Sequence, residues 1–269
     1  MYNDWLTIGP LTIHGYGACI AIGLLAALFL ASYRAKKRGM NDDICYGLTF
    51  SSAVFGFLGA KIMYCIVEWK EFIQNPASFI SSSGFVVYGG ITAGILAAYV
   101  YTKIKKVSFI DYLELCMPSV ALGQAFGRLG CFFAGCCYGK ETDSCIGITF
   151  HNSLYAPNDV SLIPTQLLSS AGNLLNMALL LFIAKRTKKK GTVTACYIIF
   201  YSVGRYFIEM LRNDDRGTVG SLSTSQFYGI ITLIIGVVIF IIAQKHKEPE
   251  VETVAAESTV EDTKEDETV

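Results

Sequence analysis

Seven long apolar stretches restrict this chain to one broad class of fold. Each is long enough to cross about 30 Å of hydrocarbon at about 1.5 Å of helical rise per residue. The stretches run over Gly15–Tyr33, Cys45–Val67, Phe85–Tyr101, Tyr112–Tyr138, Thr165–Ala184, Val193–Met210 and Gln226–Ala243. With 52% hydrophobic and 16% charged residues, the composition excludes an average soluble domain. We therefore predict an all-α, polytopic integral membrane protein with seven transmembrane helices.

The basic residues between the stretches predict the orientation of the chain. Along the chain, the segments before and between the seven stretches carry none, four, one, three, one, five and two lysines or arginines, and Lys245 and Lys247 follow the last stretch directly. Because basic loops remain in the cytoplasm, we expect the N-terminus outside and the C-terminus inside. The first stretch lacks the basic leading region and the small-residue cleavage site of a secretory signal, so we expect it to be retained.

The chain divides into two regions of different composition. Residues 1–243 form the expected seven-helix transmembrane domain. Residues 244–269 carry nine acidic and three basic residues and are rich in glutamate and threonine. Such a polar segment cannot bury a core, so we expect an acidic, disordered cytoplasmic tail with no chemistry of its own.

Four charged residues interrupt the apolar stretches: Lys61, Arg128, Arg205 and Glu209. A charge at membrane depth is costly and points to a functional site by default. The expected orientation places all four in the outer half of the bilayer. Other polar side chains open the remaining stretches at the same side, namely His14, Tyr16, Tyr88, Thr165, Gln166 and Gln226. All seven stretches are therefore expected to contribute to one outward-facing polar zone.

Arg205, Glu209 and Arg212 follow each other at positions i, i+4 and i+7, so they share one helical face. A structural ion pair between Arg205 and Glu209 explains part of this pattern. One carboxylate cannot, however, neutralise Lys61, Arg128 and Arg205 together. The excess positive charge needs an anion, and a phospholipid head group is available at this depth. The fork of arginine suits bidentate binding of its phosphate.

Gly127 and Gly130 flank Arg128 and have two possible roles. Small residues let helices pack closely, and they also let a ligand approach the backbone. Both interpretations remain open for these two positions.

Four cysteines cluster after Arg128 in the pattern C-x4-C-C-x7-C: Cys131, Cys136, Cys137 and Cys145. This is no standard zinc spacing, and the three histidines are scattered, so we assign no metal to the site. We interpret the four cysteines first as small hydrophobic residues of a membrane helix. A disulfide between Cys145 and Cys136 or Cys137 remains open on the oxidising side of the membrane.

Five motifs resemble those of the prolipoprotein diacylglyceryl transferases. The segment GRLGCFFAGCCYG at Gly127–Gly139 is similar to the family signature, and GRYFIEMLR at Gly204–Arg212 to a second motif. The opening IGPLTIHGYG, the Tyr-Gly-Gly step at Tyr88 and the Pro-Thr-Gln step at Pro164–Gln166 also match in order. The resemblance extends from about Ile8 to Ala243.

The resemblance implies a specific reaction in the bacterial plasma membrane. This family transfers the diacylglyceryl group of phosphatidylglycerol to the lipobox cysteine thiol of an exported prolipoprotein, the first step of lipoprotein maturation. It uses no metal or soluble cofactor, and we expect no nucleic-acid partner. The expected catalytic residues are Arg205, Glu209, His14, Tyr16 and Tyr88. The expected head-group residues are Arg128, Lys61, Gly127, Gly130, Gly139, Arg212 and Gln166.

The chain departs from the family pattern at several signature positions. Cys131, Ala134 and Cys136 stand where the family usually has Asn, Asn and Glu, and Tyr88 stands where it usually has histidine. The group that accepts the thiol proton therefore remains open among Glu209, His14 and Tyr88. A divergent phospholipid-dependent transferase with another acceptor, and a non-enzymatic lipid-binding membrane protein, are the alternative functions.

Overall fold

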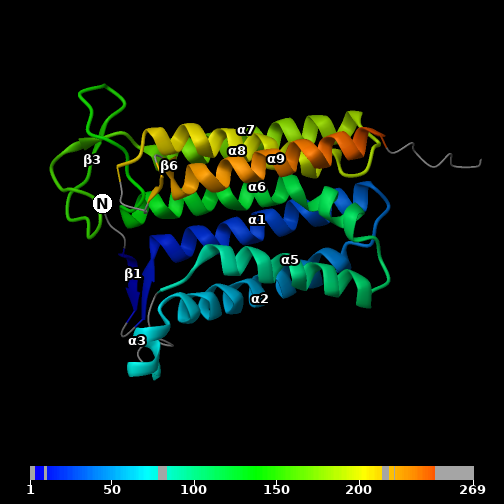
Figure 1. Cartoon of the computed structure of the whole chain (residues 1–269), viewed down its shortest axis with the longest axis horizontal. Helices are drawn as coiled ribbons and strands as arrows, with labels where there is room; N and C mark the ends of the chain where they lie inside the picture. The colour runs from blue at the N-terminus through cyan, green and yellow to red at the C-terminus, as the bar shows by residue number, and fades with distance from the viewer. Residues whose placement is uncertain (1–3, 9–10, 78–83, 214–217, 221, 246–269) are drawn as a thin grey trace, which may run out of the picture.

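The computed structural model describes residues 4–8, 11–77, 84–213, 218–220 and 222–245 and is predominantly helical (Figure 1). Each apolar stretch coincides with one long helix. These helices are α1 (Gly15–Lys37), α2 (Asp43–Val67), α5 (Val87–Ile104), α6 (Phe109–Ala134), α7 (Thr165–Arg186), α8 (Thr192–Met210) and α9 (Thr224–Lys245). A short helix, α3 (Trp69–Gln74), follows α2. The prediction of an all-helical membrane protein is confirmed in this coarse form.

Within the described residues, four helices are long and apolar enough to cross a membrane: α1, α2, α7 and α9. The other three expected spans are helices of more mixed composition. Helix α6 carries Asp111, Glu114 and Arg128, and α8 carries Arg205 and Glu209. These charges lower the mean hydropathy of both helices.

The fourth expected span was placed over Tyr112–Tyr138, and its end is wrong. Helix α6 begins at Phe109, where Ser108 accepts a hydrogen bond from the backbone N–H of Asp111. It ends at Ala134, because Gly135 adopts the left-handed conformation with φ of 73°. A left-handed glycine is a common helix terminator, and the chain leaves the helix axis there. Cys136, Cys137 and Tyr138 therefore lie in a turn beyond the helix.

Three small antiparallel sheets lie outside the all-α prediction. Strand β1 (Asp4–Ile8) pairs with β2 (Leu11–His14), β3 (Ile148–Thr149) with β4 (Ser161–Leu162), and β5 (Thr218–Val219) with β6 (Leu222–Ser223). All three lie at the same end of the helical bundle (Figure 1). The long connection between α6 and α7 has its own apolar core of Phe150, Ala156 and Leu162.

The helices pack as neighbouring pairs. Helix α2 lies along α5, α1 along α6, and α8 along α9, while α6 also contacts α7 and α8. Small residues allow a close approach of α2 and α5: a Cβ atom on Gly89 would lie 2.5 Å from the Gly59 carbonyl oxygen. Gly89 in the Tyr-Gly-Gly step therefore lets α5 approach α2.

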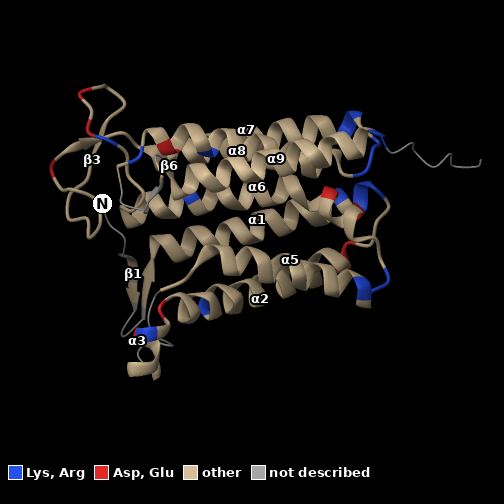
Figure 2. Ribbon diagram, in the orientation of Figure 1, with Lys and Arg blue, Asp and Glu red and all other residues tan. Residues whose placement is uncertain are grey.

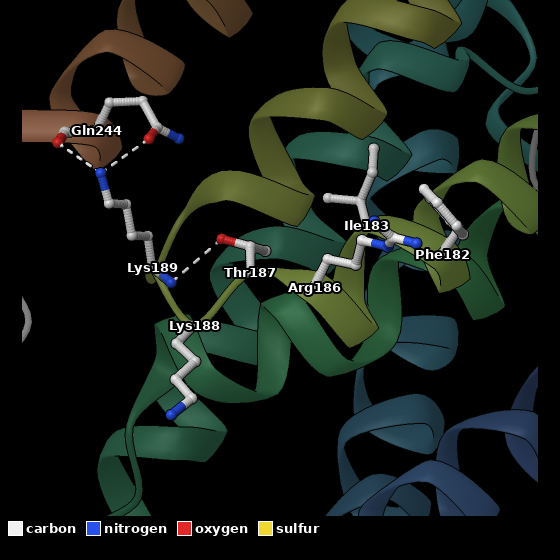
Figure 3. A pocket seen from close by; sticks show the side chains of 7 residues that line it. All are labelled: Phe182, Ile183, Arg186, Thr187, Lys188, Lys189 and Gln244. Atoms are coloured by element: carbon white, nitrogen blue, oxygen red, sulfur yellow. Dashed lines mark hydrogen bonds between the residues drawn. The ribbon is translucent and has the colours of Figure 1, made fainter.

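Lysine and arginine residues gather mainly at the end of the bundle opposite the small sheets (Figure 2). Lys189 in the α7–α8 loop donates from Nζ to the backbone oxygen of Gln244 at 3.1 Å and to its Oε1 at 3.0 Å (Figure 3). On the buried side of this end, Glu114 accepts hydrogen bonds from the backbone N–H groups of Val193 and Thr194. Glu114 thus caps the N-terminus of α8.

The boundary expected at residue 243 falls just inside the last helix, since α9 continues to Lys245. The remainder of the acidic tail, residues 246–269, lies outside the described residues.

Candidate active site

An arginine–glutamate cluster on α8 forms the centre of the candidate site. Arg205 Nη2 lies 2.9 Å from Glu209 Oε2, and Arg212 Nε lies 4.0 Å from the same oxygen. The Glu209 and Arg212 side chains are almost fully buried, with 6% and 3% exposure. The spacing of these three residues therefore predicted their contact correctly, on one face of the helix and its continuation.

Two serines beside α9 complete this network. Ser223 donates from Oγ to Glu209 Oε1 at 3.1 Å, and Arg205 Nη2 donates to Ser225 Oγ at 2.8 Å. The N-terminal turn of α9 therefore fixes the orientation of both members of the ion pair. Among the described residues, Arg205 Nη1 is buried and has no hydrogen-bond partner. That N–H group is available to a ligand.

Arg128 of α6 and Arg205 of α8 line the same cavity, which has a volume of about 260 Å³. Arg128 and Arg212 both lie close enough to Arg205 to interact with it electrostatically. The sequence had grouped Lys61 with Arg128 and Arg205 as the uncompensated cations. In the structure, Arg212 lies beside Arg205 and Glu209, and Glu209 is the acidic partner of both arginines among the described contacts. Three guanidinium groups around one carboxylate leave a site suited to an anion.

The cavity also contains polar groups of α7 that the sequence analysis missed. Asn173 and Asn176 line it, and both side chains are buried. Neither Nδ2 nor Oδ1 of Asn176 has a hydrogen-bond partner within the part of the chain that the structure describes. A buried, unsatisfied amide costs about 1 to 3 kcal/mol. The signal was present in the sequence as two asparagines inside an apolar stretch, three residues apart.

Gly139 lies where three backbone segments meet. It forms a β-bridge with Arg212, and its N–H donates to the Ile163 carbonyl at 3.0 Å. A Cβ atom at this position would lie 2.5 Å from that same carbonyl oxygen. The glycine therefore permits the signature segment to hold the backbone of Arg212, which is a positioning contact.

The turn between α6 and Gly139 is held by the start of α7. Gln166 donates from Nε2 to the Cys136 carbonyl at 2.8 Å, and Thr165 donates from Oγ1 to the Cys137 carbonyl at 2.7 Å. Gln166, expected among the head-group residues, thus has a described role in bracing this turn.

The glycines beside Arg128 differ in their surroundings. A Cβ atom on Gly130 would lie 3.1 Å from the Tyr16 carbonyl oxygen, so Gly130 lets α6 pack against α1. Among the described residues, apart from its own helix backbone and chain neighbours, nothing lies within 4 Å of the equivalent position on Gly127. Tyr16 itself is exposed and lies within electrostatic reach of Arg128.

The remaining expected residues lie at the same end of the molecule but in other contacts. The Tyr88 ring packs against Tyr228 of α9, with ring centroids 4.7 Å apart. Lys61 Nζ lies 3.4 Å from the Gly84 carbonyl oxygen and over the Phe85 ring. His14 is exposed at the junction of β2 and α1. Their roles in a reaction remain predictions.

The chain is similar to known proteins over most of its length. The family model described as prolipoprotein diacylglyceryl transferase matches residues 4–242. A phosphatidylglycerol–prolipoprotein diacylglyceryl transferase of Clostridium tetani is 46% identical over 239 residues, covering 88% of this chain and 96% of the relative. A second such transferase, numbered 2 and from Clostridium perfringens, is 42% identical and covers 86% and 91%. The Oceanobacillus iheyensis enzyme of the same name is 32% identical, covering 89% and 87%.

Proposed function

The chain belongs to the prolipoprotein diacylglyceryl transferase family, and we infer that it transfers the diacylglyceryl group of phosphatidylglycerol to the lipobox cysteine thiol of exported prolipoproteins. The single structural observation that best supports this assignment is the cavity shared by Arg128 and Arg205. Phosphatidylglycerol and the exported prolipoprotein both reach the protein at the membrane. The phosphate of the lipid supplies the negative charge that this cavity requires.

The head group of phosphatidylglycerol fits the polar lining of the cavity. We assign its phosphate to Arg128 and to the open Nη1 of Arg205. The free glycerol hydroxyls then pair with Asn176, whose amide donates from nitrogen and accepts at oxygen. The diacylglyceryl portion extends toward the surrounding apolar surface. This arrangement satisfies each buried polar group that the cavity leaves open.

Transfer requires one bond to form and one to break. The thiolate sulfur of the prolipoprotein attacks the glyceryl carbon that carries the phosphate oxygen. The carbon–sulfur bond forms, the carbon–oxygen bond breaks, and its electron pair leaves with glycerol phosphate. Negative charge develops on the leaving phosphate, so guanidinium groups fixed around it lower the barrier. Glu209 contributes by fixing Arg205.

The thiol proton needs a separate acceptor. Both Glu209 oxygens already face partners, because Arg205 and Arg212 approach Oε2 and Ser223 donates to Oε1. The Tyr88 ring packs against Tyr228. We assign the proton to His14, whose exposed imidazole at the start of α1 has a ring nitrogen that can accept it. Replacement of His14 by glutamine should then lower kcat.

The outer leaflet of the bacterial plasma membrane is the proposed location of the site. Seven spans with the N-terminus outside follow from the loop charges, and the clustering of basic side chains at the opposite end of the bundle supports this orientation (Figure 2). The site then faces the side from which exported prolipoproteins arrive.

Complementation tests the assignment directly. The chain should be expressed in bacterial cells depleted of their own transferase, together with a reporter prolipoprotein. Mass spectrometry of the reporter should show the added diacylglyceryl group, and the purified protein should release glycerol phosphate. Release without modification of the reporter would point to another acceptor. Folded, membrane-inserted protein that gives neither product would favour a non-enzymatic lipid-binding protein.

A further inference from the structure

Three cysteine thiols meet beside the candidate site although the sequence separates them. The Sγ atoms of Cys131, Cys136 and Cys137 all lie within 4.8 Å of one another. Two sulfurs bound to one zinc ion at about 2.3 Å can lie no more than about 4.6 Å apart. Small side-chain rotations therefore suffice to place one ion between all three. Spacing along the chain gave no hint of this, because the end of α6 inside the motif was not recognised.

The turn after α6 is shaped to bring the thiols together. Gly135 ends the helix in the left-handed conformation, and Cys137 adopts it as well, with φ of 64°. A non-glycine residue rarely takes this conformation unless its surroundings enforce it. The hydrogen bonds from Thr165 and Gln166 to the backbone of this turn provide the enforcement. As a result, Cys136 and Cys137 turn back toward Cys131 on the last turn of α6.

The electrostatic surroundings favour thiolates at this place. Arg212 lies within hydrogen-bond reach of Cys137, and Arg128 interacts with Cys131 through space. Three thiolates on Zn²⁺ leave one net negative charge, and on Cu⁺ two. The neighbouring arginines offset either charge.

We propose that Cys131, Cys136 and Cys137 bind one soft, thiophilic metal ion, Zn²⁺ or Cu⁺, as a structural site. Soft thiolate ligands select these ions over magnesium or calcium. Three thiols lose their protons to solvent, three metal–sulfur bonds form, and no redox change occurs. The ion ties the end of α6 to the turn that leads to Gly139, so its role is to hold the signature segment. It takes no part in the transfer reaction.

Metal retention by the full-length protein tests this proposal. Purified protein in lipid nanodiscs should be reduced, stripped with a chelator, and given Zn²⁺ or Cu⁺ in separate arms against a chromophoric competitor. One ion per chain should remain bound in at least one arm, and the arm identifies the ion. Cys137→Ser should weaken binding at least tenfold, whereas Cys145→Ser, an exposed thiol of the same loop, should bind like the wild type.

Alkylation of the wild-type protein provides a test that does not depend on whether a cysteine variant folds. The bound ion should protect Cys131, Cys136 and Cys137 from iodoacetamide and leave Cys145 reactive, as read by peptide mass spectrometry. Retention of neither ion would overturn the proposal. So would protection that does not depend on the metal, or equal binding by a chain in which all three cysteines are serine.

Discussion

Arg128→Ala gives the sharpest test of the anion site. The variant removes one of the two guanidinium groups that line the cavity while Arg205, Glu209 and Ser225 keep their own contacts. A hydrogen bond to a charged group contributes about 1.5 to 3 kcal/mol. Since about 1.4 kcal/mol corresponds to a factor of ten, kcat/KM should fall roughly tenfold to hundredfold. Arg128→Lys should recover little of this loss, because an ammonium group cannot form the bidentate fork.

The assay should follow glycerol phosphate release from phosphatidylglycerol in nanodiscs, with a lipobox peptide as acceptor. Arg186→Ala is a matched control, since it removes an arginine at the far end of α7, where Arg186 lies over the Phe182 ring. If the phosphate contact strengthens as the leaving group departs, kcat should fall along with kcat/KM. Wild-type kcat/KM in Arg128→Ala, with normal folding, would refute the assignment of this cavity to the phosphate.

Three further predictions follow from other contacts of the site. Gly139→Ala should lower the melting temperature and the activity, because the added Cβ overpacks against the Ile163 carbonyl oxygen. Such overpacking destabilises a fold by about 1 to 3 kcal/mol. Gly127→Ala is the control and should match the wild type in melting temperature, because its added Cβ meets open space. Asn176→Leu should raise KM for phosphatidylglycerol severalfold and leave the melting temperature unchanged or higher, since it removes a buried unsatisfied amide; an unchanged KM would contradict its contact with the head group. In a protein in which Cys145 is replaced, a cysteine introduced at Asn158 should react with an impermeant thiol reagent added to intact cells. A cysteine introduced at Thr187 should react only after the cells are permeabilised, and the reverse pattern would invert the proposed orientation.

The sequence predicted the helices better than it predicted the segments between them. Apolar runs are long-range, redundant signals, so the positions of α1, α2 and α7 follow from them to within a few residues. The end of α6 depends instead on one residue, Gly135, within a run that stays apolar beyond it. Periodicity carries no information about such an end, which is why the predicted span continued through Tyr138.

The same contrast applies to the site. Arg205, Glu209 and Arg212 meet because helical spacing determines their relative positions, and the sequence contains that spacing. The cavity between α6, α7 and α8 depends on how three separate helices pack, so Asn173 and Asn176 were missed. Lys61 was grouped with the arginines by depth alone, and its part in the site stays a prediction.

The turn from Gly135 to Gly139 connects the two sites of this protein. At one end, its cysteine side chains form the thiol cluster with Cys131. At the other end, the Gly139 backbone bridges to Arg212, which contacts the Glu209 carboxylate that orients Arg205. A change in the thiol cluster can therefore reach the arginines proposed to bind phosphate through the braced backbone of Cys136–Gly139. Cys131 and Cys136 stand where the family signature usually has asparagine and glutamate, so the proposed metal ion would hold this turn in a way that depends on residues in which this chain departs from the signature.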